Sequence, residues 1–141
     1  MVSLNGRTSA ILILIALPSG FNEFLTGATP LPALLFDPIV LPFVVGFYGA
    51  GVLAIRELSV RWGKGWPSVF VMGMAFGIML EGIATRTFFY DTNGQVGILA
   101  VYGRYLGINW VWAVVNTLID ALYTVAIPIM LAARLFPETR E

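Results

Sequence analysis

Long apolar stretches separated by short polar connections constrain the fold of this chain more than any other feature. Four such stretches follow one another, at Thr8–Gly27, Pro38–Val60, Pro67–Phe88 and Ile108–Leu135. A transmembrane helix needs about 20 predominantly apolar residues, so each stretch is long enough to cross a bilayer. Within lipid, only helices and closed barrels satisfy their own backbone hydrogen bonds. The sequence therefore predicts an all-α integral membrane four-helix bundle, forming one transmembrane domain over residues 1–141.

The composition supports this class and excludes several kinds of chemistry. Charged residues make up 11% of the chain, whereas a soluble domain is typically about 25% charged. Eight basic and eight acidic residues leave no net charge, so no nucleic-acid partner is indicated. The chain has no cysteine and no histidine. Thiolate and imidazole metal ligands, and a histidine catalytic base, are therefore excluded. We expect the bilayer as the main partner and no cofactor.

The basic residues predict the orientation of the spans, because cytoplasmic loops carry an excess of lysine and arginine. With the N-terminus inside, six basic residues fall on the cytoplasmic side and two outside: Arg7, Arg56, Arg61, Lys64, Arg134 and Arg140 against Arg86 and Arg104. This distribution predicts a multi-pass protein of the plasma membrane with both termini cytoplasmic. Between spans three and four, the apolar segment Val96–Leu106 is only 11 residues long. We expect that segment to lie along the membrane surface.

Small residues at four-residue spacing predict where helices approach one another closely. In the third span Gly73, Gly77 and Glu81 recur every fourth residue, so they share one helical face. A similar pair, Gly46 and Ala50, occurs in the second span. We therefore expect close helix packing at all four of these small residues.

Polar residues in three of the spans are predicted to form one buried layer in the outer half of the bilayer. At about 1.5 Å rise per residue, Glu23, Glu81 and Asn116 fall at similar depths, and Asp120 lies one turn deeper. Arg86 lies above Glu81 and is the nearest intrinsic cation. Carboxylates brought close together share protons, take up a cation or pair with a guanidinium. Glu23, Glu81, Arg86, Asn116 and Asp120 are thus candidate ligand-binding residues.

Three functional interpretations follow from this layer. The first is a non-enzymatic membrane protein whose polar site binds a cation, a proton or a small ligand. The second is a membrane-embedded hydrolase using Glu81 and Asp120 around an oxygen-ligated metal. The third is an accessory or packing subunit of a membrane complex, in which an Arg86–Glu pair merely fixes helix packing. Because four spans barely enclose a transport path, transport would favour a homo-oligomer.

Several segments resemble an uncharacterised group of prokaryotic polytopic membrane proteins. They are EFLTGATP (Glu23–Pro30), RELSVRWGKGWPS (Arg56–Ser68), FGIMLEGIATRTFF (Phe76–Phe89) and INWVW (Ile108–Trp112). This resemblance covers most of the chain and implies a multi-pass fold without indicating an activity.

The chain also resembles, more remotely, the intramembrane CAAX-protease and bacteriocin-processing family. Members of that family have a Glu-Glu pair, with an arginine four residues after the second glutamate. Here Glu81 stands at the second glutamate, Leu80 replaces the first, and Arg86 follows five residues later. Without a histidine, the activated-water chemistry of that family is not supported. The resemblance implies a relative that keeps the polar layer without the catalytic set.

Overall fold

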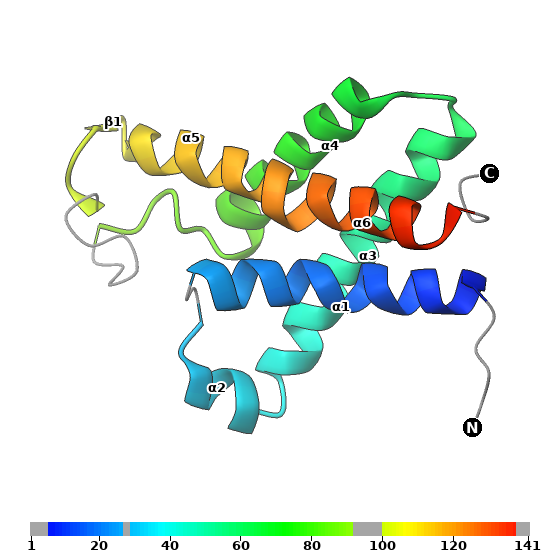
Figure 1. Ribbon diagram of the computed structural model, residues 1–141. Coiled ribbons are helices and arrows are strands. Elements are labelled where there is room, and N and C mark those ends of the chain that lie inside the picture. Colours follow the sequence, from blue (N-terminus) through cyan, green and yellow to red (C-terminus); the bar gives the residue numbers. More distant parts are fainter. Residues whose placement is uncertain (1–5, 27–28, 92–99, 138–141) are drawn as a thin grey trace.

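Helices make up most of the computed structural model, which describes residues 6–26, 29–91 and 100–137 (Figure 1). Two long helices are uninterrupted: α1 (Gly6–Thr26) and α3 (Val40–Arg61). A third consists of α4 (Trp66–Met79) and the π-helix η1 (Leu80–Ala84) that continues it. The fourth consists of α5 (Trp110–Ile119), the π-helix η3 (Asp120–Ala126) and α6 (Ile127–Leu135). A short helix α2 (Leu31–Phe36) precedes α3, and the antiparallel strands β1 (Arg104–Tyr105) and β2 (Ile108–Asn109) precede α5.

Three helices of the described chain are long and apolar enough to cross a membrane. They are Val40–Arg61, Trp66–Ala84 and Trp110–Leu135. These helices coincide closely with the second, third and fourth predicted spans, and they support a mostly helical, multi-pass membrane protein. The first predicted span corresponds to α1, which has 21 residues. Its role as a fourth span belongs to the proposal made below.

The long helices lie in two crossing pairs. In Figure 1, α1 and the continuous helix α5–η3–α6 run alongside each other, and α3 and α4 cross them obliquely. Helix α1 contacts α3, η3 and α6, while α4 contacts η3, α5 and α3. The start of α1, the turn between α3 and α4, and the end of α6 all lie on the right-hand side of Figure 1. Every long helix therefore contributes to a shared core.

The core consists of aliphatic and aromatic side chains from all the long helices. Leu14, Val52, Leu80 and Val125 are almost fully buried within it. The ring of Phe76 packs edge-on against Tyr48, with ring centroids 6.3 Å apart. These contacts hold α1, α3, α4 and η3 at fixed spacing, which in turn fixes the polar side chains at one end of the core.

Two of the four small residues predicted for helix packing lie where α4 crosses η3. A Cβ added to Gly73 would come 3.0 Å from the Ala121 Cα, and one added to Gly77 would come 2.8 Å from the Asp120 Cβ. Both distances are too short for an ordinary side-chain contact, so glycine is what permits this approach.

The other two predicted packing residues, Gly46 and Ala50, do not pack against a helix of the described chain. Both are exposed, and a Cβ added to Gly46 would meet nothing within 4 Å. Gly49 faces α1 instead, where an added Cβ would lie 3.0 Å from the Ile15 Cα. Four-residue spacing identifies a helix face, but it does not say whether that face meets a neighbour.

The third predicted span ends earlier than expected, at Ala84 rather than Phe88. The Thr85 backbone N–H donates to the Leu80 carbonyl at 2.8 Å, closing the last wide turn of η1. Arg86 then adopts a φ of 59°, in the left-handed region that commonly ends helices. The chain turns away at this residue, so Phe88 lies in the following loop.

The predicted surface segment Val96–Leu106 ends in a β-hairpin, and its residues 96–99 lie outside the described residues. Arg104 pairs with Asn109 across the two strands. Leu106 and Gly107 both have positive φ, at 51° and 79°, as the two central residues of a type I′ turn require. Arg104 Nη2 donates to the carbonyls of Phe89 and Gly107, each at 2.9 Å. The guanidinium thus ties the hairpin to the loop that follows η1.

Candidate functional site

A cavity of about 260 Å³ lies where α1, α3, η1, α5 and η3 meet, and we call it the polar cavity. Among the described residues, those that line it all have polar side chains and none is basic: Asn22, Glu23, Thr29, Tyr48, Glu81, Thr85, Thr87, Trp112, Asn116 and Asp120. Four of the five predicted site residues (Glu23, Glu81, Asn116 and Asp120) therefore come together in one cavity. The fifth, Arg86, does not line it.

Glu23 is brought to the cavity by the last turns of α1. Next to it, Asn22 donates through Nδ2 to the Tyr48 hydroxyl at 2.5 Å, and Ser19 donates to the Val44 carbonyl at 3.4 Å. These two bonds attach α1 to α3 at this depth. Glu23 is only 5% exposed, and its Oε2 has no hydrogen-bond partner. One wall of the cavity therefore presents a buried carboxylate oxygen that lacks a donor.

Asp120 reaches the cavity from the first residue of η3. It is 2% exposed, its Oδ1 accepts from the Thr124 hydroxyl at 3.0 Å, and its Oδ2 has no hydrogen-bond partner. Gly77 provides the space that this carboxylate needs against α4. A second carboxylate oxygen without a donor thus lines the same cavity.

The wide turns of η3 have a cause in the sequence. Pro128 lacks a backbone N–H, and its ring clashes with the carbonyl four residues earlier, at Thr124. The π-helix η3 ends two residues before this proline. Single π-turns inside helices often occur at functional sites. Both π-helices contain a cavity carboxylate: Glu81 in η1 and Asp120 in η3.

Glu81 differs from the other two carboxylates because two hydroxyl groups donate to one of its oxygens. Its Oε2 accepts from Thr85 Oγ1 at 3.1 Å and also from Thr87 Oγ1. Thr87 Oγ1 in turn accepts from Trp112 Nε1 at 3.1 Å. A chain of hydrogen bonds therefore runs from α5 through the loop after η1 to Glu81. This chain holds Glu81 in place, whereas Glu23 Oε2 and Asp120 Oδ2 are buried oxygens without a donor among the described residues.

The three cavity carboxylates lie on different helical segments: Glu23 on α1, Glu81 on η1 and Asp120 on η3. Glu81 and Asp120 line the same cavity, and carboxylates brought close together repel each other. Within the described ranges, no group of three or more acidic, histidine or cysteine residues is arranged to hold a metal ion. The cavity therefore combines negative charge with many hydrogen-bond acceptors distributed over several walls.

Arg86, predicted as the counter-ion of Glu81, is exposed and forms no ion pair with it. The two ion pairs among the described residues both involve Glu57, with Arg61 at 2.7 Å and with Arg56 at 3.8 Å. Because the left-handed backbone at Arg86 ends the helix, this residue does not continue the face that carries Glu81. Threonine hydroxyls, not a guanidinium, occupy the position beside that carboxylate.

Sequence reasoning did not include Tyr48, Thr85, Thr87 and Trp112 among the site residues. Thr85 and Thr87 lie in a segment that was predicted to continue the third helix. Their hydrogen bonds to Glu81 depend on the turn that ends this helix earlier. Trp112, Asn116 and Asp120 follow one another at four-residue spacing on α5 and η3, a signal that could have added the tryptophan. Tyr123, which follows Asp120 in η3, is 42% exposed, because the π-helix changes the angular position of the residues after Asp120.

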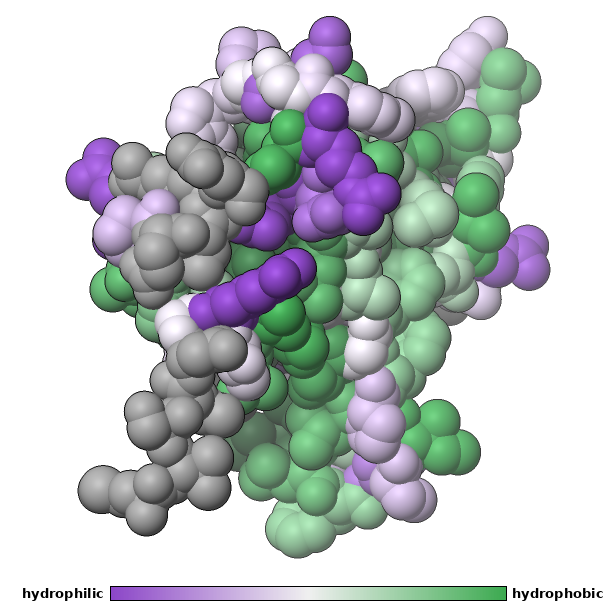
Figure 2. Space-filling view, turned by 90° about the vertical axis from the view of Figure 1, so that its right-hand side faces the viewer, coloured by the Kyte–Doolittle hydropathy of each residue, from purple (hydrophilic) through white to green (hydrophobic). Residues whose placement is uncertain are grey.

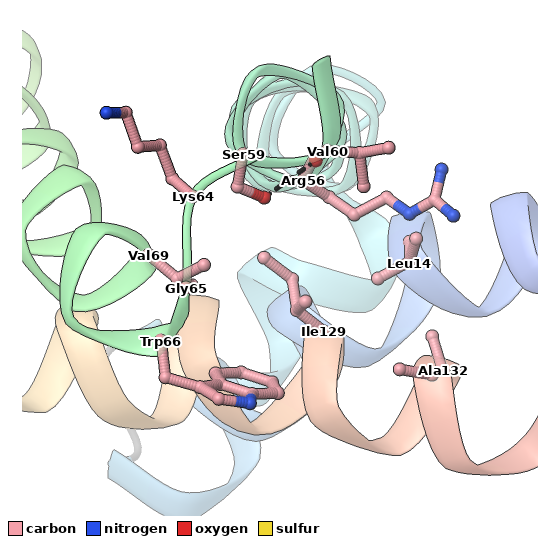
Figure 3. A pocket seen from close by; sticks show the side chains of 11 residues that line it. Leu14, Arg56, Ser59, Val60, Lys64, Gly65, Trp66, Val69, Ile129 and Ala132 are labelled. Carbon is pink, nitrogen blue, oxygen red and sulfur yellow. Dashed lines mark hydrogen bonds between the residues drawn. The ribbon is translucent and has the colours of Figure 1, made fainter. Parts of the chain in front are cut away.

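A second cavity, of about 150 Å³, lies at the opposite end of the helices, near the turn between α3 and α4 (Figure 3). Its walls are apolar, with Leu14, Val69 and Ile129 facing it. Lys64 and Arg56 lie at its rim, and their charged ends point in opposite directions. This end of the molecule, which faces the viewer in Figure 2, gathers strongly hydrophilic side chains. Diverging cations above apolar walls are typical of residues that anchor a helix at a membrane interface.

Long apolar helices and a polar cavity built between them define a multi-pass membrane protein. The chain belongs to a family described as an uncharacterized membrane protein family, which it matches over residues 12–141. No curated protein and no solved structure matches it with significant similarity. The matched region contains every residue of the polar cavity. The resemblance to multi-pass membrane proteins agrees with this membership, whereas the remote resemblance to the CAAX-protease family finds no support in these comparisons.

Proposed function

We propose that this protein is a non-enzymatic membrane protein that binds a cation in the polar cavity. The observation that carries the proposal is the pair of buried oxygens without donors, Glu23 Oε2 and Asp120 Oδ2. A buried acceptor left unsatisfied costs about 1–3 kcal/mol, and more when the group is charged. A bound cation would remove this cost at both atoms. It would also offset the repulsion between Asp120 and Glu81.

The lining of the polar cavity favours a positively charged ligand over an anion or a neutral molecule. Three carboxylates face it, and none of its lining residues is basic. Arg104, the basic residue nearest in sequence to α5, already donates to backbone carbonyls of the loop and hairpin. In a low-dielectric environment, charge complementarity of this kind is stronger than in water.

The proposal includes four spans, with α1 as the first. Five described basic residues lie at the end of the molecule that holds the start of α1, the α3–α4 turn and the end of α6: Arg7, Arg56, Arg61, Lys64 and Arg134. The positive-inside rule supports a cytoplasmic location for that end. The polar cavity would then open toward the outer half of the plasma membrane. If the cation also crosses the membrane, a homo-oligomer or a partner subunit would complete the path.

The test uses the purified protein in nanodiscs of neutral phosphatidylcholine. Its thermal unfolding midpoint is measured against increasing Na⁺, K⁺, Ca²⁺ and alkylammonium chlorides. A ligand that binds only the folded state at 100 times its Kd stabilises by about 2.7 kcal/mol, so at least one cation should raise the midpoint. Asp120→Asn and Glu23→Gln should abolish that increase.

Glu57→Gln is the matched control, because Glu57 is exposed, already paired with Arg61, and remote from the cavity. Its cation response should equal that of the unmodified protein. The proposal fails if no cation shifts the midpoint, or if all three variants respond alike.

A further inference from the structure

The arrangement of the cavity also indicates which class of cation it takes. We propose that the ligand is a small organic amine in its ammonium form, donating N–H groups to Glu23 Oε2 and Asp120 Oδ2. This inference rests on the cation site proposed above and narrows it. Three observations support it: the separation of the two oxygens onto different helices, the volume of the cavity, and the aromatic side chains in its walls.

The first observation concerns the positions of the oxygens that lack donors. Glu23 lies near the end of α1, and Asp120 lies at the start of η3. A calcium or magnesium ion gathers six or more oxygens at about 2.0–2.6 Å around a single point. Glu81, which could add further ligands, already accepts from the hydroxyls of Thr85 and Thr87. An ammonium group instead carries several N–H donors that point in different directions, and it can therefore reach acceptors on separate walls.

The second observation is the volume of the polar cavity, about 260 Å³. One water molecule occupies about 30 Å³ in the liquid. The cavity therefore exceeds the space needed for one dehydrated inorganic ion several times over. A nitrogen with a short alkyl chain would occupy more of this space and leave fewer waters to be held in order.

The third observation is the presence of two aromatic side chains, each held by a hydrogen bond at its polar atom. The Tyr48 hydroxyl accepts from Asn22, and the Trp112 N–H donates to Thr87. Both rings are thereby held in fixed orientations at the cavity wall. Aromatic faces attract ammonium groups by about 0.5–2 kcal/mol, and they also offer apolar surface to an alkyl chain. Three carboxylates with two aromatic residues thus match an amphiphilic ammonium ion better than a bare metal ion.

The experiment compares ligands that differ in one property at a time, using the whole chain in phosphatidylcholine nanodiscs. The probes are n-propylammonium, tetramethylammonium, n-propanol, K⁺ and Ca²⁺. Propylammonium has both charge and N–H donors, tetramethylammonium has charge without donors, and propanol has a donor without charge. Binding is measured by ligand-observed NMR and by the shift of the unfolding midpoint. We expect propylammonium to bind at least tenfold more tightly than every other probe.

Two isosteric variants then locate the bound amine. Asp120→Asn and Glu23→Gln should each weaken propylammonium binding at least tenfold, while Glu57→Gln leaves it unchanged. Helical content measured by circular dichroism establishes that each variant is folded. The comparison of probes on the unmodified protein needs no variant, so it tests the inference even if one variant does not fold.

The outcomes separate this inference from the proposed function. If K⁺ or Ca²⁺ binds in a manner that depends on Asp120 and propylammonium does not, the amine is wrong while the cation site stands. Tetramethylammonium binding as tightly as propylammonium would also overturn the inference, because N–H donation would then contribute nothing. If no cation binds the unmodified protein, both proposals fail.

Discussion

Gly77 of α4 faces Asp120 of η3 so closely that a Cβ at position 77 would lie 2.8 Å from the Asp120 Cβ and 3.0 Å from its Oδ2. Helix packing and the polar cavity are therefore coupled at this contact. The absence of a side chain on one helix makes room for a buried carboxylate on the other. Changes on α4 should consequently affect both stability and ligand binding.

Gly77→Ala should destabilise the protein and displace the Asp120 carboxylate. Overpacking a tight contact typically costs about 1–3 kcal/mol, so we expect a lower unfolding midpoint together with weaker cation binding. Gly46→Ala is the control, because an added Cβ there meets nothing within 4 Å. Since alanine is favoured over glycine in helices by about 1 kcal/mol, that variant should be at least as stable as the unmodified protein. Equal stability of the two variants would contradict the packing described here.

Asp120→Asn should leave the protein folded and, without added cation, at least as stable as before. The buried Oδ2 has no donor, and a neutral amide is less costly to bury than an unpaired carboxylate. The same variant should lose the stabilisation that a cation provides. Thermal unfolding with and without the cation separates these two effects. A large loss of stability in the cation-free protein would show that Asp120 has a favourable partner.

Thr87→Val should break the hydrogen-bond chain between Trp112 and Glu81 without changing the shape of the side chain. It removes a donor to Glu81 and an acceptor for the indole N–H. Leaving buried polar groups unsatisfied costs about 1–3 kcal/mol, which should lower the unfolding midpoint measurably. Thr117→Val is a suitable control, because Thr117 lies on α5 outside the polar cavity. A Thr87→Val protein as stable as that control would argue against the chain.

Arg104 and Arg86 should behave oppositely on substitution, although both were expected at the outer side. Arg104→Met removes the guanidinium that bonds the Phe89 and Gly107 carbonyls. It should therefore make the connection between η1 and α5 cleavable by protease at lower enzyme concentration. Arg86→Met removes an exposed side chain that makes no ion pair with Glu81, so proteolysis and cation binding should both stay unchanged. If Arg86→Met lost cation binding, the original prediction that Arg86 acts in the site would be favoured.

The proposed orientation can be tested with single cysteines, since the chain has none of its own. Lys64→Cys lies in the exposed turn between α3 and α4, and Tyr102→Cys lies in the exposed segment before β1. A membrane-impermeant maleimide added to intact cells should label Tyr102→Cys and should label Lys64→Cys only after lysis. The reverse pattern would place the polar cavity toward the cytoplasm.

Much of the architecture could be predicted because burial in lipid imposes strong rules on sequence. Apolar stretches of sufficient length located the helices Val40–Arg61, Trp66–Ala84 and Trp110–Leu135. Helical depth, at a constant rise per residue, predicted Glu23, Glu81 and Asn116 at similar depths, with Asp120 one turn deeper. In the structure all four residues line one cavity. Depth along a helix depends only on the number of residues from its end, so it can be estimated from a single sequence.

The predictions that were wrong depended on the rotation of a helix about its axis or on a turn of the backbone. Gly46 and Ala50 were expected at a helix contact, but Gly49 makes it, because spacing alone does not give the rotation of a helix about its axis. Arg86 was expected to pair with Glu81, but a left-handed residue ends the helix at that point. Thr85 and Thr87 then take the place of the cation. The left-handed conformation of Arg86 could not be predicted from the spacing of apolar residues.

The sequence by itself determined the class of the protein and the approximate limits of its helices, because lipid requires long apolar helices and makes charge rare within them. Only the tertiary structure decided which carboxylate oxygens of the buried acids lack a hydrogen-bond donor. Glu81 Oε2 accepts from two hydroxyls of the segment that follows η1, whereas Glu23 and Asp120 each keep one buried oxygen without a partner among the described residues. Hydrogen bonding depends on direction and on distances of about 3 Å, and the packing of several helices sets both.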